Sequence, residues 1–239
     1  MASIKTSKGR LYYKPVNIYL GIKQIDRDIA FENLKVVVRI LNKVGVKVSP
    51  AYGTLLGIIR ENNFIEWDED IDLFVLKEDK EKLLDAFWDL KDEGFELVRV
   101  DRCDYLYSIM RNGEYIDFYI MEKISPEVRT SFGEHFVLEK YLTNLIEWDF
   151  KGLTIYIPKD YEECLEFIYG DWRTPIRYAD FEQNKLTIFK LKLRTWIKNQ
   201  LPYFIRFKLQ KKHHIPDYNR FLVKCKNRGV NLKYEIKYP

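Results

Sequence analysis

The amino-acid sequence predicts an α+β protein in which helices pack beside a small mixed or largely antiparallel sheet, followed by a basic helical tail. Residues 25–44 place apolar side chains at helical spacing, and Gly45 ends the run. Extended segments gather between residues 95 and 121, where Asn112-Gly113 is a strong hairpin signal. The chain has 239 residues, of which 46% are hydrophobic, so it can bury a substantial core.

The elements expected around these two landmarks alternate between helix and strand. A short extended segment at 46–48 leads to a small-residue turn and a brief helix with the sequence LLGIIR. A strand at 71–76 follows, and then a helix from about 78 to 92 that Gly94 ends. Further elements are expected as strands at 95–100, 105–110, 114–121 and 153–157 and as a helix at about 160–168. Between about 125 and 150 the pattern assigns no element.

The charge distribution divides the chain into an acidic body and a basic tail. The overall charge is +4, but residues 181–239 carry 15 Lys or Arg against three acidic residues, which is +12, and residues 1–180 therefore carry −8. We predict a domain at 1–180 and a basic amphipathic extension at 181–239, with a helix at 181–200 that Pro202 ends. Such a tail favours an anionic partner, which can be a phospholipid surface, nucleic acid or an acidic polymer.

The cysteines and the apolar runs favour a cytoplasmic protein. Cys103, Cys164 and Cys225 are odd in number and widely spaced, so they suggest neither a disulfide framework nor a zinc site. No apolar run approaches the roughly 20 residues that a membrane-spanning helix needs, and no signal-like segment follows the basic start. We expect a cytoplasmic location, and peripheral contact with the inner face of the membrane is compatible with it.

The most informative stretch is AYGTLLGIIRENNFIEWDEDIDLFV, residues 51–75, which sets Asp68, Asp70 and Asp72 at alternating positions. On a strand, Asp70 and Asp72 point to one face while their apolar neighbours point to the other. Two converging carboxylates suit a hard divalent cation such as Mg²⁺. Asp117, which lies mid-strand among apolar residues, is the candidate for a third carboxylate, because an unpaired buried charge would be costly there.

Three other interpretations compete for this acidic run. A solvated acidic loop does not need the apolar residues that interrupt and follow the carboxylates. A calcium-binding EF-hand loop fails because Leu73 and Asp79 stand where that loop needs glycine and glutamate. The Asp-x-Asp motif of a sugar-nucleotide glycosyltransferase would look similar, and the surrounding residues have to separate the two.

Those surrounding residues carry a family resemblance. The string GTLLGIIRENNFIEWDEDID resembles the signature of the LicD and fukutin family, a Gly-Thr-Leu-Leu-Gly turn followed by an Arg, Phe-Ile and Trp-Asp-Asp-Asp-Ile-Asp. The segment FIYGDWRTP at 167–175 is similar to a second element of that family. The resemblance spans about residues 25–175. The departures are Glu69 in place of Asp and Glu66 in place of Pro, and neither removes the Asp70/Asp72 pair.

The resemblance implies a nucleotidyltransferase fold and a phosphotransferase. Members of the family move a phosphorylated alcohol, such as phosphocholine or ribitol phosphate, from a CDP-linked donor to a glycan hydroxyl and release CMP. By resemblance, Asp70 and Asp72 would hold Mg²⁺, or alternatively Mn²⁺, on the donor, and Asp117 would help to activate the acceptor hydroxyl. Gly53 and Thr54 would cradle a phosphate at a helix N-terminus.

Several further residues have two possible roles. Arg60 would give a second phosphate contact, or it is a surface arginine at a helix end. Tyr169 and Asp171 would shape the wall of the site, together with Gly170, Trp172 and Pro175, although Trp172 can also be pure core. Trp67 is expected to fix the loop by packing. His135 is expected to be solvent-exposed, with a place on the acceptor side as the alternative.

Alternatives of other classes remain open from the sequence alone. A nucleotidyltransferase that adds a nucleotide to a small alcohol phosphate, an antibiotic or an RNA end would use the same residues. A binding module with a decayed site is disfavoured because all three aspartates are present. The tail would contact an anionic membrane bearing a lipid-linked glycan acceptor, or less favourably a nucleic acid.

Overall fold

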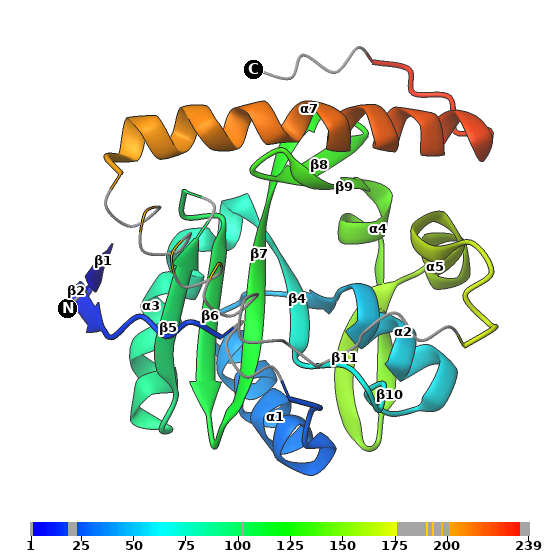
Figure 1. The fold of residues 1–239 in the computed structure, drawn as a ribbon. Coiled ribbons are helices and arrows are strands. Elements are labelled where there is room, and N and C mark those ends of the chain that lie inside the picture. The colour runs from blue at the N-terminus through cyan, green and yellow to red at the C-terminus, as the bar shows by residue number, and fades with distance from the viewer. Residues whose placement is uncertain are drawn as a thin grey trace.

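A computed structural model describes residues 2–18, 23–101, 103–175 and 201–234, together with residues 190, 193 and 197. Helices and small sheets alternate along these residues, which confirms the predicted α+β class (Figure 1). The central strands are β3 (Val48–Pro50), β4 (Ile71–Leu76), β5 (Glu96–Asp101), β6 (Leu106–Arg111) and β7 (Glu114–Ser125). Their order across the sheet is β3-β4-β7-β6-β5.

One strand pair makes the sheet mixed. Strands β5, β6 and β7 pair in antiparallel fashion, and β6 joins β7 through the predicted turn, where Asn112 and Gly113 have φ of +55° and +83°. Strands β4 and β7 pair in parallel, with Asp72 directly opposite Asp117. This parallel pairing brings together two segments that are far apart in the sequence.

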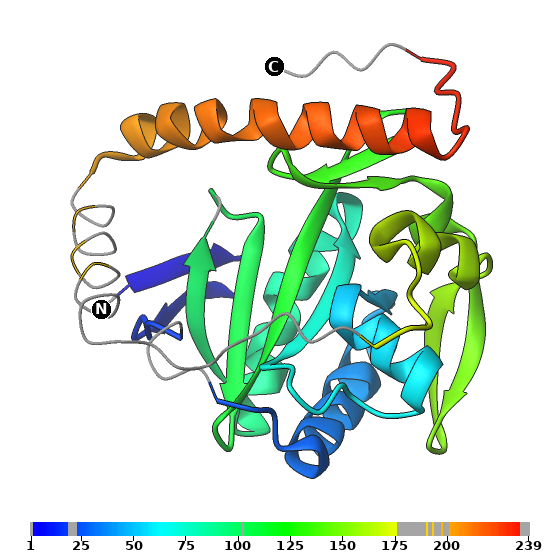
Figure 2. The same ribbon diagram turned by 45° about the vertical axis from the view of Figure 1, so that its right-hand side comes forward.

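Two helices cover one face of the sheet, as Figures 1 and 2 show. Helix α1 (Arg27–Lys43) begins where the carboxylate of Asp26 accepts hydrogen bonds from the N–H groups of its first turn, and it buries an apolar stripe. Helix α3 (Lys80–Asp92) follows the short 3-10 turn η1 (Lys77–Asp79) and packs on α1. Helix α2 (Tyr52–Glu61) lies against β4 and is longer than the brief helix expected from the sequence.

Several elements were not predicted. The region without a sequence assignment forms β8 (Val128–Ser131), β9 (Glu134–Leu138), α4 (Lys140–Thr143) and β10 (Leu145–Phe150). Strand β7 runs past its expected end because β8 pairs with its last residues. Strand β10 pairs with β11 (Leu153–Pro158), which α5 (Tyr161–Tyr169) follows. An N-terminal hairpin of β1 (Ala2–Thr6) and β2 (Gly9–Tyr13) packs near α3 and β5.

Helix α7 (Tyr203–Asn227) crosses the top of the molecule in both ribbon views (Figures 1 and 2). Its second half docks on the body, because Phe221 and Cys225 are buried and the ring of Phe136 in β9 lies 5.5 Å from Tyr218 and 5.4 Å from Phe221. The end of the basic segment therefore completes the core. The helix expected at 181–200 and the boundary expected at 180 lie outside the described residues, apart from three single positions.

Two expectations about the whole chain can be compared with the described structure. All three cysteines are free thiols, as expected. Among the described helices, none combines the length and the apolar composition needed to cross a bilayer.

Candidate active site

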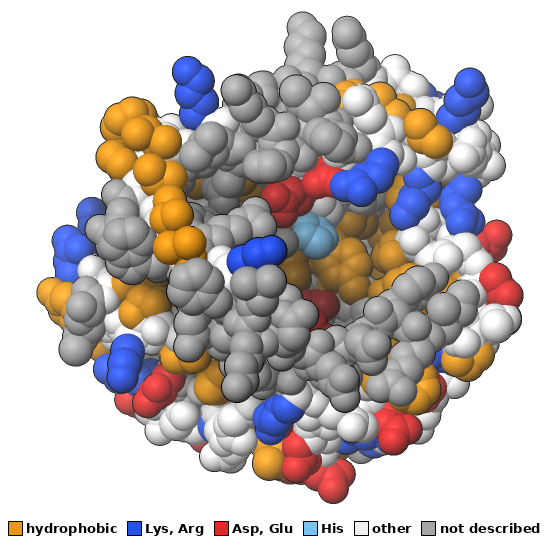
Figure 3. Space-filling view, in the orientation of Figure 1, with side chains coloured by type: hydrophobic (Ala, Val, Ile, Leu, Met, Phe, Trp, Pro, Cys, Tyr) orange, Lys and Arg blue, Asp and Glu red, His pale blue; other side chains and the backbone are white. Residues whose placement is uncertain are grey.

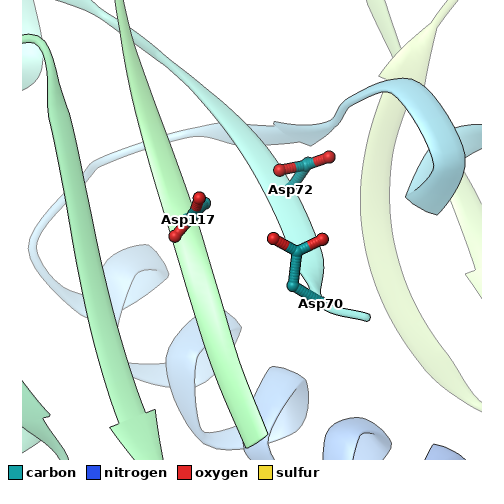
Figure 4. A group of neighbouring side chains, drawn as sticks. All are labelled: Asp70, Asp72 and Asp117. Atoms are coloured by element: carbon teal, nitrogen blue, oxygen red, sulfur yellow. The ribbon is translucent and has the colours of Figure 1, made fainter. Parts of the chain in front are cut away.

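Three carboxylates meet at the junction of β4 and β7. Asp72 and Asp117 are paired directly across the two parallel strands, and Asp70 lies just before β4 on the same side (Figure 4). One oxygen from each side chain lies within 4.8 Å of the others. The structure thus brings together the three residues that the sequence singled out as possible metal ligands.

The electrostatics of this cluster favour a bound cation. Burial, and then the neighbouring Asp72 carboxylate, raise the pKa of Asp70 well above its ordinary value. Burial and the Asp117 carboxylate do the same to the pKa of Asp72, against a hydrogen bond from Tyr119 that lowers it. The Oδ1 atom of Asp72 is buried and has no hydrogen-bond partner within the described part of the chain. Carboxylate oxygens held together in this way match the ligand set of a hard divalent cation.

Helix α2 fixes the strand that carries Asp72. The backbone N–H of Asp72 donates to the hydroxyl of Thr54 at 2.8 Å, and its carbonyl accepts from the N–H of Ala51 at 2.9 Å. Thr54 is buried and does not line the pocket described below, so its hydroxyl supports Asp72 rather than facing a ligand. Of the two residues predicted to contact a phosphate, Gly53 and Thr54, only Gly53 lines the pocket.

The GTLLG segment, expected to begin with a turn, lies within α2, and its two glycines allow close packing against this helix. A Cβ on Gly53 would lie 2.2 Å from Oδ2 of Asp68. A Cβ on Gly57 would lie 2.6 Å from the carbonyl oxygen of Asn63 and 2.9 Å from the nitrogen of Ile65, which are backbone atoms that cannot rotate away. The glycines thus let the loop that carries the acidic residues fold back over the helix.

The carboxylates open into a pocket of about 380 Å³. The face presented in Figure 3 is hollowed, with acidic side chains in the hollow and basic side chains beside it. Of the remaining predicted residues, those that line the pocket are Arg60, Trp67, Tyr169, Asp171 and Trp172. Glu69, where the sequence departs from the family signature, also lines it, and burial raises its pKa.

Arg60 and the 169–172 segment lie against each other at one wall. The guanidinium of Arg60 donates to the carbonyl of Trp172 at 3.2 Å and to the carboxylate of Glu61 at 2.7 Å. Its side chain is only 13% exposed, so it is not an ordinary surface arginine. Trp172 is buried and still lines the pocket, which reconciles its two expected roles. The carboxylate of Asp171 accepts a hydrogen bond from Thr174 at 2.6 Å.

His135 differs from the expectation of a solvent-exposed side chain. Its ring is half-buried, 5.1 Å from the ring of Tyr52 and 5.0 Å from that of Tyr119. Both tyrosines line the pocket, so the ring of His135 packs beside the pocket wall. The sequence could not show this because the unassigned 125–150 region contains β9.

Sequence reasoning also missed Arg99 and two tyrosines. Arg99 forms an ion pair with Asp117, and its Nε donates to the hydroxyl of Ser108 at 2.8 Å. Tyr115 and Tyr119 lie two residues on either side of Asp117 and therefore share its face of β7. The alternation in β7 was a usable signal for the tyrosines, whereas Arg99 had none.

Comparisons with known proteins agree with this geometry. Residues 45–160 match the family model described as LicD/FKTN/FKRP, nucleotidyltransferase domain. The uncharacterized protein RP689 of Rickettsia prowazekii (strain Madrid E) is 26% identical over 149 residues, which cover 59% of this chain and 54% of that protein. The ribitol-5-phosphate transferase FKTN of Macaca fascicularis is 26% identical over 170 residues, which cover 66% of this chain and 36% of that protein. The chain thus spans about half or less of the length of these curated relatives.

Solved structures of antibiotic-modifying enzymes also show some likeness. The lincomycin-bound lincosamide antibiotic adenylyltransferase LnuA has a TM-score of 0.42 and 12% identity, over 67% of this chain and 93% of that one. The enzyme ANT(2")-Ia in complex with adenylyl-2"-tobramycin has a TM-score of 0.43 and 14% identity, over 68% and 87% of the two chains.

The family model covers the GTLLG turn and all three carboxylates, whereas the similar segment at 167–175 lies outside it. The match confirms the family resemblance that the sequence predicted, and the macaque relative, a ribitol-5-phosphate transferase, is of the predicted enzyme class. Over residues 45–160 the chain is thus similar to the nucleotidyltransferase domain of the LicD/FKTN/FKRP family.

Proposed function

We propose that the protein transfers a phosphorylated alcohol, such as phosphocholine or ribitol phosphate, from a CDP-linked donor to a hydroxyl of a glycan or lipid-linked glycan. The observation that carries this proposal is the Asp70/Asp72/Asp117 cluster at the base of a pocket inside a LicD-type domain. The description of the macaque relative as a ribitol-5-phosphate transferase supports this class of substrate.

In the proposed reaction, Asp70 and Asp72 would hold Mg²⁺ or Mn²⁺, with Asp117 as the third ligand. When bound, the cation would offset the negative charge of the cluster and polarise the donor phosphate. The site residues would then align the acceptor hydroxyl with the phosphorus of the alcohol phosphate. A new P–O bond would form to the acceptor oxygen while the hydroxyl proton passes to Asp117, the bond to the CMP phosphate would break, and CMP would leave with its electron pair.

The chain's own groups place the two substrates. Gly53 lies in the first turn of α2, whose N–H groups have no side-chain cap, so this helix end suits a donor phosphate. Arg60, in the last turn of the same helix, would contact a second phosphate oxygen. Asp117 would accept a hydrogen bond from the acceptor hydroxyl and so help to activate it. Tyr169 and Asp171 would border the acceptor.

The tail would bring the enzyme to a membrane that carries its acceptor. Leu193, Ile197 and Phe204 are 45%, 46% and 70% exposed, and the neighbouring Lys190 and Lys208 are exposed as well. Exposed apolar side chains among lysines are typical of a segment that lies on an anionic bilayer. Location at the inner face of the membrane is therefore part of this proposal, in preference to a nucleic-acid contact.

A panel of CDP-alcohols tests the function. With Mg²⁺ and CDP-choline or CDP-ribitol, we expect one donor to raise the melting temperature and, with a glycan acceptor, to release CMP. A chelator should abolish both effects, since without the cation the acidic pocket repels the donor's phosphates. Release of pyrophosphate from a nucleoside triphosphate, with the nucleotide kept on the acceptor, would instead establish the alternative nucleotidyltransferase reaction. The Asp70→Asn variant is the control for both products.

A further inference from the structure

Arg99 belongs to a row of polar side chains that crosses four neighbouring strands. Arg99 of β5 is paired with Ser108 of β6, Ser108 with Asp117 of β7, and Asp117 with Asp72 of β4. Directly paired residues point to the same face of a sheet. The row therefore places a guanidinium beside the acidic cluster, on the face where the pocket opens.

A β-bulge is what turns Arg99 to this face. The register of β5 against β6 shifts between Leu97, which pairs with Ile109, and Arg99, which pairs with Ser108. If the ladder continued from Leu97 without a bulge, Val98 would pair with Ser108, and Arg99 would pair with Tyr107 and point to the other face. Bulges re-aim side chains and are frequent next to active sites.

Arg99 is one of few basic residues in a pocket lined mainly by acidic ones. Six carboxylates line the pocket, whereas Arg60 and Arg99 are its only arginine or lysine lining residues in the described chain, and Arg60 already contacts Glu61. Arg99 is 10% exposed and forms an ion pair with Asp117, which is 2% exposed. Because a guanidinium carries five donors in a planar fork, it can serve a carboxylate and a phosphate at the same time.

We propose that Arg99 is an anion-binding residue of the active site, which orients Asp117 through Oδ2 and contacts a phosphate of the donor's diphosphate. The inference rests on the proposed function in that the donor contains a diphosphate. In this role Arg99 is a fixed cation on the β5 side of the acidic cluster, whereas α2 lies on the β4 side. Ser108 is then a positioning residue, because it holds Nε of Arg99.

The test measures Mn²⁺ and inorganic pyrophosphate binding by calorimetry, together with thermal unfolding, in wild type, Arg99→Gln, Arg99→Lys and Arg39→Gln. Arg39 is the matched control, since it forms an exposed ion pair with Glu93 at 2.7 Å and lies outside the pocket. We expect Arg99→Gln to bind Mn²⁺ at least as tightly as wild type, because a nearby positive charge is gone. Its affinity for pyrophosphate at saturating Mn²⁺ should fall by about tenfold or more. Arg39→Gln should match wild type in both.

Unchanged pyrophosphate affinity in Arg99→Gln would overturn the proposal and leave Arg99 as a structural partner of Asp117. If this variant does not fold, Arg99→Lys decides, because it keeps the charge but not the fork. Weaker pyrophosphate binding with normal Mn²⁺ binding in Arg99→Lys then supports the proposal, and wild-type affinity for both ligands overturns it. Because pyrophosphate contains neither the alcohol nor the nucleoside, its binding tests Arg99 independently of the proposed function. A protein that binds pyrophosphate through Arg99 but no CDP-alcohol would refute the function alone.

Discussion

Ionisation of Asp68 should lower the free energy of unfolding of the metal-free protein as the pH rises. Burial and the Glu69 carboxylate raise the pKa of Asp68 from 3.8 to about 6. The folded chain therefore binds this proton more tightly than the unfolded chain. The contribution of Asp68 to stability is fully present below about pH 4 and is lost as the pH rises through about 6. A difference of about two powers of ten in proton affinity corresponds to about 3 kcal/mol above that window.

The Asp68→Asn variant removes this titration while it keeps an acceptor for the Glu69 N–H, which Oδ1 of Asp68 accepts at 3.2 Å. In urea unfolding with a chelator, we expect the variant to gain on wild type between about pH 4 and pH 6, reaching up to about 3 kcal/mol at pH 7.5. Asp89→Asn is the control, since Asp89 forms an exposed ion pair with Lys8 at 3.4 Å. Its stability should differ from that of wild type by about 0.5 kcal/mol or less. A difference between Asp68→Asn and wild type that does not change with pH would refute the reasoning.

Three further changes test the site, the turn and the tail. Asp70→Asn should abolish transfer and leave the metal-free protein at least as stable as wild type in thermal unfolding, since it relieves repulsion; near-normal turnover at saturating Mg²⁺ would exclude Asp70 as a ligand. Gly57→Ala should cost about 1–3 kcal/mol in urea unfolding, because its Cβ would meet the backbone of 63–65; a variant as stable as wild type contradicts that contact. Phe221→Ala should lower the free energy of unfolding by about 3 kcal/mol, whereas Phe204→Ala, on the exposed part of the same helix, should lower it by about 0.5 kcal/mol or less. Equal losses in the two variants would show that α7 does not dock as described.

The sequence was most informative where the evidence is local. Alternation around Asp70 and Asp72 predicted both the strand and the shared face of the two carboxylates, and Asn112-Gly113 predicted the hairpin that joins β6 to β7. Each of these depends on neighbouring residues, through the two-residue period of a strand or the positive φ of a turn. Asp117 was found by the cost of a buried charge, which is also a local argument.

The rest depends on partners that a single strand does not reveal. Alternation shows which face a residue occupies but not which strand lies beside it, so the parallel pairing of β4 with β7 could not be predicted. Regular alternation would put Arg99 on the same face as Leu97, but the bulge at Val98 puts Arg99 on the opposite face. His135 lies in a strand whose sequence, EHFVL, gives no regular pattern.

The parallel pairing of β4 with β7 also determines when the site comes into existence. Asp72 and Asp117 are 45 positions apart, and they meet only when these two strands close that long loop. A partly folded chain with α1 and the β6–β7 hairpin in place would still hold the two aspartates apart, so it would not yet offer the cluster. A cation held by this cluster would therefore bind only to the assembled sheet, and its binding free energy would add to the stability of the whole domain rather than to one segment.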